Sequence, residues 1–274
     1  MSPFAPRKGA FSRSERRQNP PASWFSAPLG WPQRRRGGVF QGGPAQQFST
    51  PLSQRRGGLA SIPTTTASWC RRTASRPGFF FAAKLHSAFT HDASRDSGAA
   101  AAFRRAFAPM LDAGVLRAVL AQFRYDFADS ADARGHLRWV AAEFGRETRL
   151  VLELRHRSWQ ADEAVAFVRE LGAGVALLDY PLGRDSFDAP LPLTPGDAYL
   201  RLHGRNREKW FARDVAPHEP YNYDYPDAEI EELAGRSRTI LGQVKHLTIV
   251  ANNHYRGKAV SAALRLKAKL LSAR

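Results

Sequence analysis

Residue types that carry acid–base chemistry occur at a short strand-like segment in the middle of this chain. Positions 150–156 read Leu-Val-Leu-Glu-Leu-Arg-His. Because side chains alternate along a strand, Glu153 and Arg155 share a face with Val151 while the leucines point the other way. A carboxylate in such a place can act as a general base, or it can form an ordinary ion pair with the arginine.

Five other apolar segments also end in polar residues. These residues are Lys84, Gln122 with Arg124, Asp179, Arg201 with His203, and Asn252 with His254. In a barrel of parallel strands the carboxyl ends of the strands converge on one face, where active sites are built. For any one residue a structural ion pair or hydrogen bond is a sufficient explanation. Six strand ends together favour a polar binding site.

Four of the polar residues are the predicted catalytic set: Glu153, His156, Asp179 and His203. Glu153 or Asp179 is the candidate general base, and His203 or Lys84 the candidate acid. The same four side chains are of the type that binds a divalent metal. However, they form no compact motif such as His-Glu-x-x-His, and neutralisation by Arg155 and Arg201 explains the carboxylates more simply. We therefore assign no metal ligand, and the cofactor stays undetermined.

The remaining polar residues are the predicted substrate-binding set. They are Lys84, His91, Gln122, Arg155, Arg201, Asn252, Asn253, Gly257 and Lys258. If two strands precede position 79, Arg201 and Gly257 follow the seventh and eighth strands of a barrel, the common phosphate-binding place. An ordinary basic loop is an equally good explanation. The aromatic run at 221–225 either walls a sugar-like ligand or only packs a loop onto the rim.

These residues require a parallel α/β framework to bring them together. Apolar segments predict strands over 79–85, 115–123, 150–154, 174–179, 198–203 and 246–252. Helical patterns predict helices over 99–110, 131–144, 162–171, 227–244 and 258–271. The alternation predicts a (β/α) barrel of the TIM type, with six strands readable and the first two missing or garbled.

Residues 1–66 differ in composition from the rest of the chain. Positions 1–78 hold 13 Lys and Arg and one acidic residue, a net of +12 out of +16 for the whole chain. Gly, Pro, Gln and Arg interrupt every apolar patch in 1–66, so this stretch is expected to be basic, of low complexity and disordered. It can be a nucleic-acid tail, an organellar transit peptide or a solvated tail without a specific role. The rest, 67–274, is the predicted barrel domain.

The order and spacing of several motifs resemble the YecE-like family, also called domain of unknown function 72. The matching text is 77–84 with Thr90-His91, Glu-Leu-Arg-His-Arg-Ser-Trp at 153–159, Asp-Tyr-Pro at 179–181, Tyr-Leu-Arg-Leu-His-Gly at 199–204, and Asn-Asn-His at 252–254. The match covers about residues 67–272. It implies a TIM-type barrel but no reaction, because the family has none established. After Gln122 the chain has Phe-Arg-Tyr where the family usually has Leu-Pro-Pro.

The resemblance also implies two N-terminal strands, with a Gly-Thr-Ser-Gly-Trp-like motif and a Glu-x-Asn-like motif, that this sequence lacks. We hypothesise that the front of the chain comes from a shifted reading frame or a mis-assigned start in GC-rich DNA. Homologous strands encoded in another frame upstream of Trp69 are the expected result of resequencing.

The sequence therefore predicts an enzyme that uses acid–base chemistry, with metal assistance as an option, on a small polar, anionic or sugar-like ligand, with hydrolase- or isomerase-type reactions as the leading class. The alternatives are a non-catalytic ligand-binding barrel and a nucleic-acid-associated protein that uses its basic tail. A small molecule is the expected partner, rather than nucleic acid or a membrane. With Cys70 as the single cysteine and no apolar run of membrane-spanning length, the chain is expected to be cytoplasmic.

Overall fold

Six parallel strands form one curled sheet in the computed structural model, which describes residues 62–76 and 78–272. The strands are β1 (Phe81–Lys84), β2 (Leu116–Gln122), β3 (Arg149–Glu153), β4 (Gly174–Asp179), β5 (Ala198–Leu202) and β6 (Leu247–Ala251). They follow one another in the sheet in chain order, and every neighbouring pair is parallel. The predicted α/β class and all six predicted strands are confirmed.

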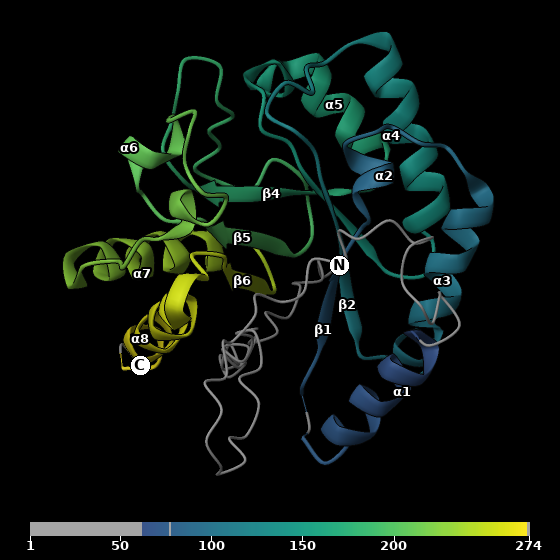
Figure 1. Ribbon diagram of the computed structural model, residues 1–274, viewed down its shortest axis with the longest axis horizontal. Coiled ribbons are helices and arrows are strands. Elements are labelled where there is room, and N and C mark those ends of the chain that lie inside the picture. The colour runs from purple at the N-terminus through teal and green to yellow at the C-terminus, as the bar shows by residue number, and fades with distance from the viewer. Residues whose placement is uncertain (1–61, 77, 273–274) are drawn as a thin grey trace, which may run out of the picture.

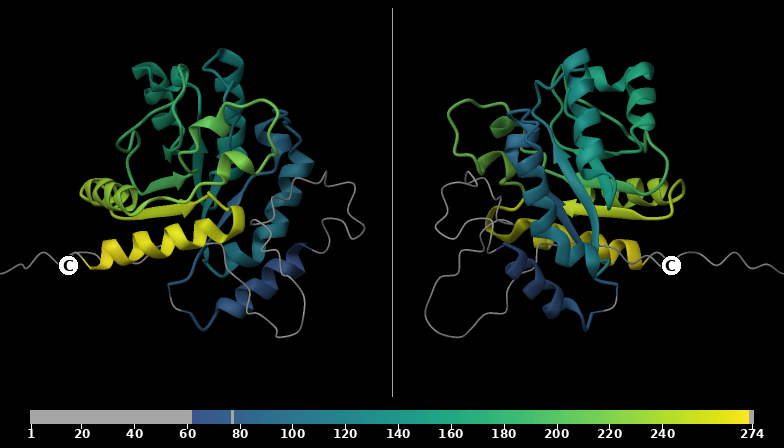
Figure 2. Two further views of the ribbon diagram at one scale, coloured as in Figure 1. Left: turned by 60° about the vertical axis from the view of Figure 1, so that its left-hand side comes forward. Right: turned by 90° about the vertical axis from the view of Figure 1, so that its right-hand side faces the viewer.

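Helices precede the first strand and follow most of the others, and the longer ones cover the outside of the sheet (Figure 1). They are α1 (Ile62–Thr73), α2 (Ser87–Thr90), α3 (Ser97–Asp112), α4 (Ala131–Phe144), α5 (Asp162–Glu170), α6 (Arg207–Trp210), α7 (Asp227–Leu241) and α8 (Lys258–Leu271), with 3-10 turns η2 (Arg157–Gln160), η3 (Glu219–Tyr221) and η4 (Tyr255–Gly257). In Figure 1, α2–α5 lie at the right of the view, beside β1 and β2, and α6–α8 lie at the left, beside β5 and β6. Helix α8 lies along β6 (Figure 2). The β4–β5 connection, 180–197, contains no helix.

Side-chain caps fix where two of the outer helices begin. The Asp96 carboxylate accepts hydrogen bonds from the backbone of Gly98 and Ala99, at 2.8 and 3.0 Å, at the start of α3. Ser130 caps α4 in the same way through Ala133, at 3.1 Å. Such caps satisfy amide donors that the first turn of a helix leaves free.

The two faces of the sheet have different contents. The outer face carries the large apolar core shared with the helices, for example Leu152, Leu177 and Leu200. The inner face carries a smaller apolar cluster whose members include Val151, Leu178 and Tyr199. Strand alternation sends every second residue inward, and near the carboxyl ends the inward residues change from apolar to polar. The inner face of the curled sheet is therefore apolar along the strands and polar at their carboxyl ends. We call this polar end the mouth of the half-barrel.

Within the described residues the six strands form a half-barrel, because β1 and β6 do not pair with each other to close the sheet. Strand β1 pairs only with β2 there, and β6 only with β5. The curvature is that of a TIM-type barrel. The first two strands of such a barrel would stand between β6 and β1.

Helix α1 begins five residues before the predicted start of the domain at 67. The Thr66 hydroxyl donates to the Ala106 carbonyl of α3, at 2.8 Å, and the Trp69 ring stacks on Phe81 with centroids 6.3 Å apart. These contacts pack α1 against α3 and the start of β1. The predicted disorder of residues 1–61 lies outside the described residues. No helix in the described part is long and apolar enough to span a membrane.

Candidate active site at the carboxyl ends of the strands

Glu153 is the centre of a charged cluster at the mouth of the half-barrel. Its side chain is fully buried and forms ion pairs with Arg155, at 2.7 Å, and with Arg201. Arg201 extends from β5 and also donates to Gln122 Oε1 of β2 and to Asn252 Oδ1 after β6, both at 2.9 Å. One guanidinium therefore connects residues from β2, β3, β5 and the end of β6. Four predicted site residues other than Glu153 are brought together by this cluster: Gln122, Arg155, Arg201 and Asn252.

His203 completes the cluster from the end of β5. Its Nε2 atom lies 3.4 Å from Glu153 Oε1, and its Nδ1 atom lies 3.1 Å from Asn252 Nδ2. Burial is the largest influence on this ring and lowers its pKa to about 4, although Glu153 acts in the opposite direction. His203 is therefore neutral at neutral pH.

Arg155 and Arg201 keep the Glu153 carboxyl group ionised. Burial alone would raise the pKa of this carboxyl, but Arg201 and Arg155 outweigh burial and hold the pKa well below its usual value. A carboxylate that stays ionised and accepts from two guanidiniums is a poor general base. Its role in this arrangement is to position Arg155 and Arg201.

Lys84, at the end of β1, is the group in the mouth that is best suited to proton transfer. Burial and then the charge of Arg201 lower its pKa to about 8, with Glu153 acting against them and Arg155 adding to them. Its ammonium group forms no hydrogen bond or ion pair within residues 62–76 and 78–272. A lysine that titrates near neutral pH can both accept and donate a proton.

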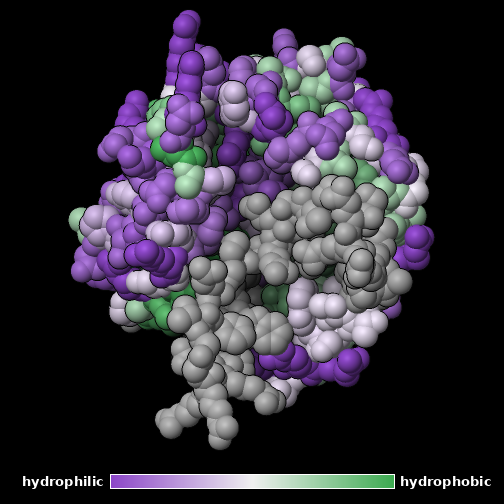
Figure 3. All heavy atoms as spheres, in the orientation of Figure 1, coloured by the Kyte–Doolittle hydropathy of each residue, from purple (hydrophilic) through white to green (hydrophobic). Residues whose placement is uncertain are grey.

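Aromatic rings border the same cluster. The Trp210 ring lies 5.9 Å from His203, 5.7 Å from Tyr180 and 5.6 Å from Tyr221, measured between centroids. The Arg155 guanidinium lies 5.8 Å from the Trp210 centroid. The space-filling view shows a hollow near the centre of this face with hydrophilic residues around it (Figure 3). The aromatic rings restrict solvent around the buried charges of the mouth.

Asp179 belongs to a different cluster from Glu153. It is the last residue of β4 and follows Val175 and Leu177 of the outer core, so its side chain is on the outer face. There it is paired with Arg205, at 2.7 Å, and accepts from the Tyr225 hydroxyl, at 2.6 Å. Tyr225 in turn accepts from the Gly204 amide, at 2.8 Å. Gly204 has φ +90°, and a Cβ there would lie 2.6 Å from Tyr223, so this turn requires glycine.

The other predicted residues have positions of their own near the rim. His156 caps η2 by accepting from the Ser158 amide, at 3.2 Å. His91 is exposed and lies 2.9 Å from the Thr90 hydroxyl. Asn253 donates to the Tyr223 carbonyl, at 2.9 Å, Lys258 donates to Asn222, at 2.6 Å, and Gly257 precedes α8 with φ +79°. Each of these residues shapes a loop around the mouth.

The predicted catalytic set therefore divides in two. Glu153 and His203 are in contact, while His156 and Asp179 lie in separate hydrogen-bond networks. Within the described part of the chain, no group of three or more His, Cys, Asp or Glu side chains is placed to hold a metal ion.

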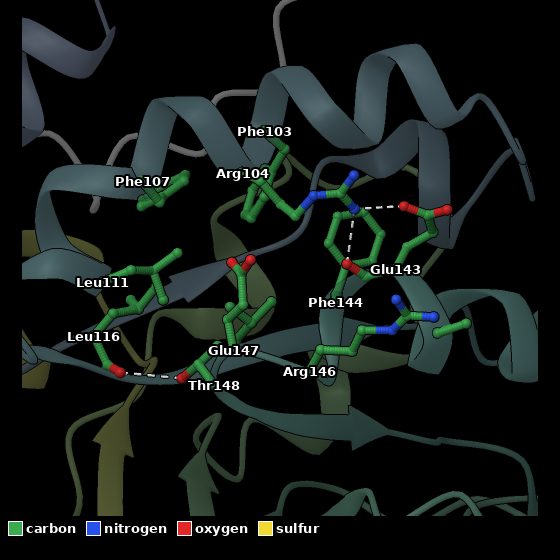
Figure 4. A pocket seen from close by; sticks show the side chains of 12 residues that line it. Phe103, Arg104, Phe107, Leu111, Leu116, Glu143, Phe144, Arg146, Glu147 and Thr148 are labelled. Carbon is green, nitrogen blue, oxygen red and sulfur yellow. Dashed lines mark hydrogen bonds and ion pairs between the residues drawn. The ribbon is translucent and has the colours of Figure 1, made fainter.

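A cavity of about 360 Å³ lies at the other end of the strands, between α3 and α4 (Figure 4). Its lining includes Phe103, Phe107, Leu116, Phe144, Glu147 and Thr148. Leu116 begins β2 and Thr148 directly precedes β3, so this cavity opens at the amino ends of the strands. It contains none of the predicted site residues.

Two tyrosines that contribute to the mouth were not predicted as site residues. Tyr199, two residues before Arg201, is buried below it, and Tyr180 borders His203. Burial raises the pKa of each hydroxyl to about 12. The alternation that placed Arg201 and His203 on one face also places Tyr199 there, so that signal was present in the sequence.

The fold and the cluster define an α/β barrel-type protein with buried charges at the carboxyl ends of its strands. The chain belongs to the family described as protein of unknown function DUF72, whose model matches residues 61–274. This confirms the resemblance seen in the sequence.

Solved structures of the family resemble this fold. A DUF72 family protein (TM1631) from Thermotoga maritima is 27% identical, with a TM-score of 0.68 over 80% of this chain and 82% of that one. A DUF72 family protein (EF0366) from Enterococcus faecalis is 24% identical, with a TM-score of 0.68 over 76% of this chain and 80% of that one. Among curated proteins there is no match.

Proposed function

We propose that this protein is an enzyme that binds a small anionic molecule at the carboxyl ends of its strands and uses Lys84 to move a proton to or from it. The observation that carries the proposal is a charge imbalance. Three cationic groups, Lys84, Arg155 and Arg201, act on one another at the mouth, and Glu153 is the carboxylate that faces them. His203 adds no charge, because its pKa is about 4.

An anion would supply the missing negative charge. Buried cations are stable only when they are paired, and the Arg201 Nε–H is buried without an acceptor within the described residues. A carboxylate or phosphate oxygen is the acceptor that guanidinium groups bind best. Gln122 and Asn252 hold Arg201 in place, so that the guanidinium is oriented before the ligand arrives.

The Lys84 amine supports catalysis rather than binding alone. Its pKa of about 8 is close to neutral, where a group can exchange protons efficiently. An amine with a pKa close to neutral can give a proton to the bound ligand or take one from it.

The test is a search for turnover with matched variants. The purified chain is incubated with pools of small carboxylic acids and phosphate esters, and consumption is followed by proton NMR. We expect at least one compound to be consumed by the natural protein and by K209M, in which the altered lysine is partly exposed and paired with Glu208. Lys84→Met should abolish consumption while ligand binding remains detectable. Binding that never leads to turnover in any protein would instead support a non-catalytic ligand-binding barrel.

A further inference from the structure

We infer that Lys84 acts as a covalent nucleophile, so that the substrate is a small anionic aldehyde or ketone that forms an imine with this lysine. The inference rests on the proposed function, because the same arginines bind the anionic group of the substrate. It goes further by naming the reacting group, a carbonyl carbon, and the bond that forms on the protein.

The Lys84 amine is placed where a substrate bound by the arginines could reach it. The side chain extends from the carboxyl end of β1, where it is half-buried beside the Glu153 cluster. The carboxylate that could pair with it is already occupied, since Glu153 accepts from Arg155 and Arg201 and contacts His203. A partly buried lysine without a bound carboxylate is costly, and its amine is available to attack an electrophile.

The arginines beside the Lys84 amine give its surroundings a positive charge. Arg201 and Arg155 both favour the neutral form of Lys84, and burial acts in the same direction. A nucleophilic lysine must lose its proton, and neighbouring cations together with desolvation are the means by which proteins achieve this near neutral pH. The same cations would hold a carboxylate or phosphate group close to the amine, which raises the effective concentration of the carbonyl.

The reaction balances without any further reactant. The neutral Lys84 nitrogen forms a bond to the carbonyl carbon and passes one of its own protons to the carbonyl oxygen, which gives a neutral carbinolamine. The new hydroxyl takes a proton from solvent and leaves as water, and the nitrogen lone pair forms the carbon–nitrogen double bond of a protonated imine. The positive charge of the iminium then withdraws electrons from the adjacent carbon, which allows proton removal or carbon–carbon bond cleavage there.

Borohydride trapping tests the inference directly. The full chain is incubated with pyruvate or with dihydroxyacetone phosphate, reduced with sodium borohydride, digested and analysed by peptide mass spectrometry. The two probes separate a carboxylate from a phosphate as the anionic group. We expect labelling of Lys84 by at least one probe, about tenfold or more above the labelling of the partly exposed Lys209.

Two variants make the result decisive. K84R keeps a positive charge but cannot form an imine, and it should retain anion binding while the label at position 84 disappears. Lys209→Met should be labelled at Lys84 as the natural protein is, and thermal unfolding shows whether each variant is folded. Equal labelling of Lys84 and Lys209 overturns the inference. Lysine-dependent turnover without any trapped adduct also overturns it, and in that case the proton-transfer role of Lys84 stands.

Discussion

Glu153 of β3 and Arg201 of β5 form a buried ion pair that passes across β4, the strand that separates them in the sheet. The pair thus crosses the interior of the half-barrel rather than joining neighbouring strands. Its carboxylate is shared with Arg155, and its guanidinium with Gln122 and Asn252. Removal of the one carboxylate leaves two buried or nearly buried cations without a counter-charge.

Replacement of Glu153 by Gln should therefore destabilise the protein by about 3–5 kcal/mol, the usual cost of breaking a buried ion pair from one side. Denaturant unfolding measures this change. The control is Glu208→Gln, because the Glu208 side chain is 84% exposed and is paired with the neighbouring Lys209. That change should cost less than about 1 kcal/mol. Equal effects of the two substitutions would contradict the central position of Glu153.

Asp179→Asn should weaken folding but leave anion binding intact. The Asp179 carboxylate holds Arg205 and Tyr225 on the outer face of β4, away from Glu153. We expect a loss of about 1–3 kcal/mol in unfolding free energy, because a charge-assisted hydrogen bond and an ion pair are lost. Tyr225→Phe should show part of the same loss. A strong decrease in anion affinity in D179N, at unchanged stability, would place Asp179 in the binding site instead.

Asn252 determines which ring nitrogen of His203 carries the hydrogen. Arg201 can only donate, so the Asn252 atom facing it is Oδ1, and the Nδ2 group therefore donates to His203 Nδ1. The hydrogen of the neutral ring is then on Nε2, facing Glu153. Nitrogen NMR should show this tautomer from pH 5 to 8. A ring that gains a proton between pH 6 and 7 would disagree with a pKa of about 4.

Lys84 should make stability depend on pH in the alkaline range. Its pKa is about 8 in the folded protein and 10.5 when exposed. Between these values the unfolded chain binds more protons, so the contribution of Lys84 to the unfolding free energy rises with pH. K84M should thus be more stable than the natural protein at pH 7, by up to about 3 kcal/mol. This advantage should shrink from pH 8 to 10.5 in denaturant titrations, and a constant difference would contradict the lowered pKa.

The sequence predicted the strands well because each is a short apolar segment followed by polar residues. It also placed Glu153 and Arg155 on one face, which the contacts show. It could not separate Asp179 from Glu153, because both close buried strands, and β4 is apolar on both faces, so its sequence does not reveal which face is inward. Helix α1 was not predicted, because three consecutive threonines, 64–66, disfavour a helix that packing on α3 then stabilises.

The sequence also did not predict which acidic residue each arginine of the mouth pairs with. Arg201 could have paired with Asp179, whereas the sheet register and the inner face direct it to Glu153. Arg205, which follows the same strand, takes Asp179 instead. Strand alternation predicts faces, but it does not predict which residues meet across the interior.

The anion-binding claim is tested most directly by calorimetric titration of inorganic phosphate into the natural protein, R155M and R124M. Arg124 is an exposed arginine paired with Asp126, and it serves as the matched control. The account predicts saturable binding at one site, weakened about tenfold or more in R155M and unchanged in R124M. Unfolding curves should show that both variants are folded. Equal affinity in R155M and the natural protein, or no saturable binding in any of the three, would contradict it.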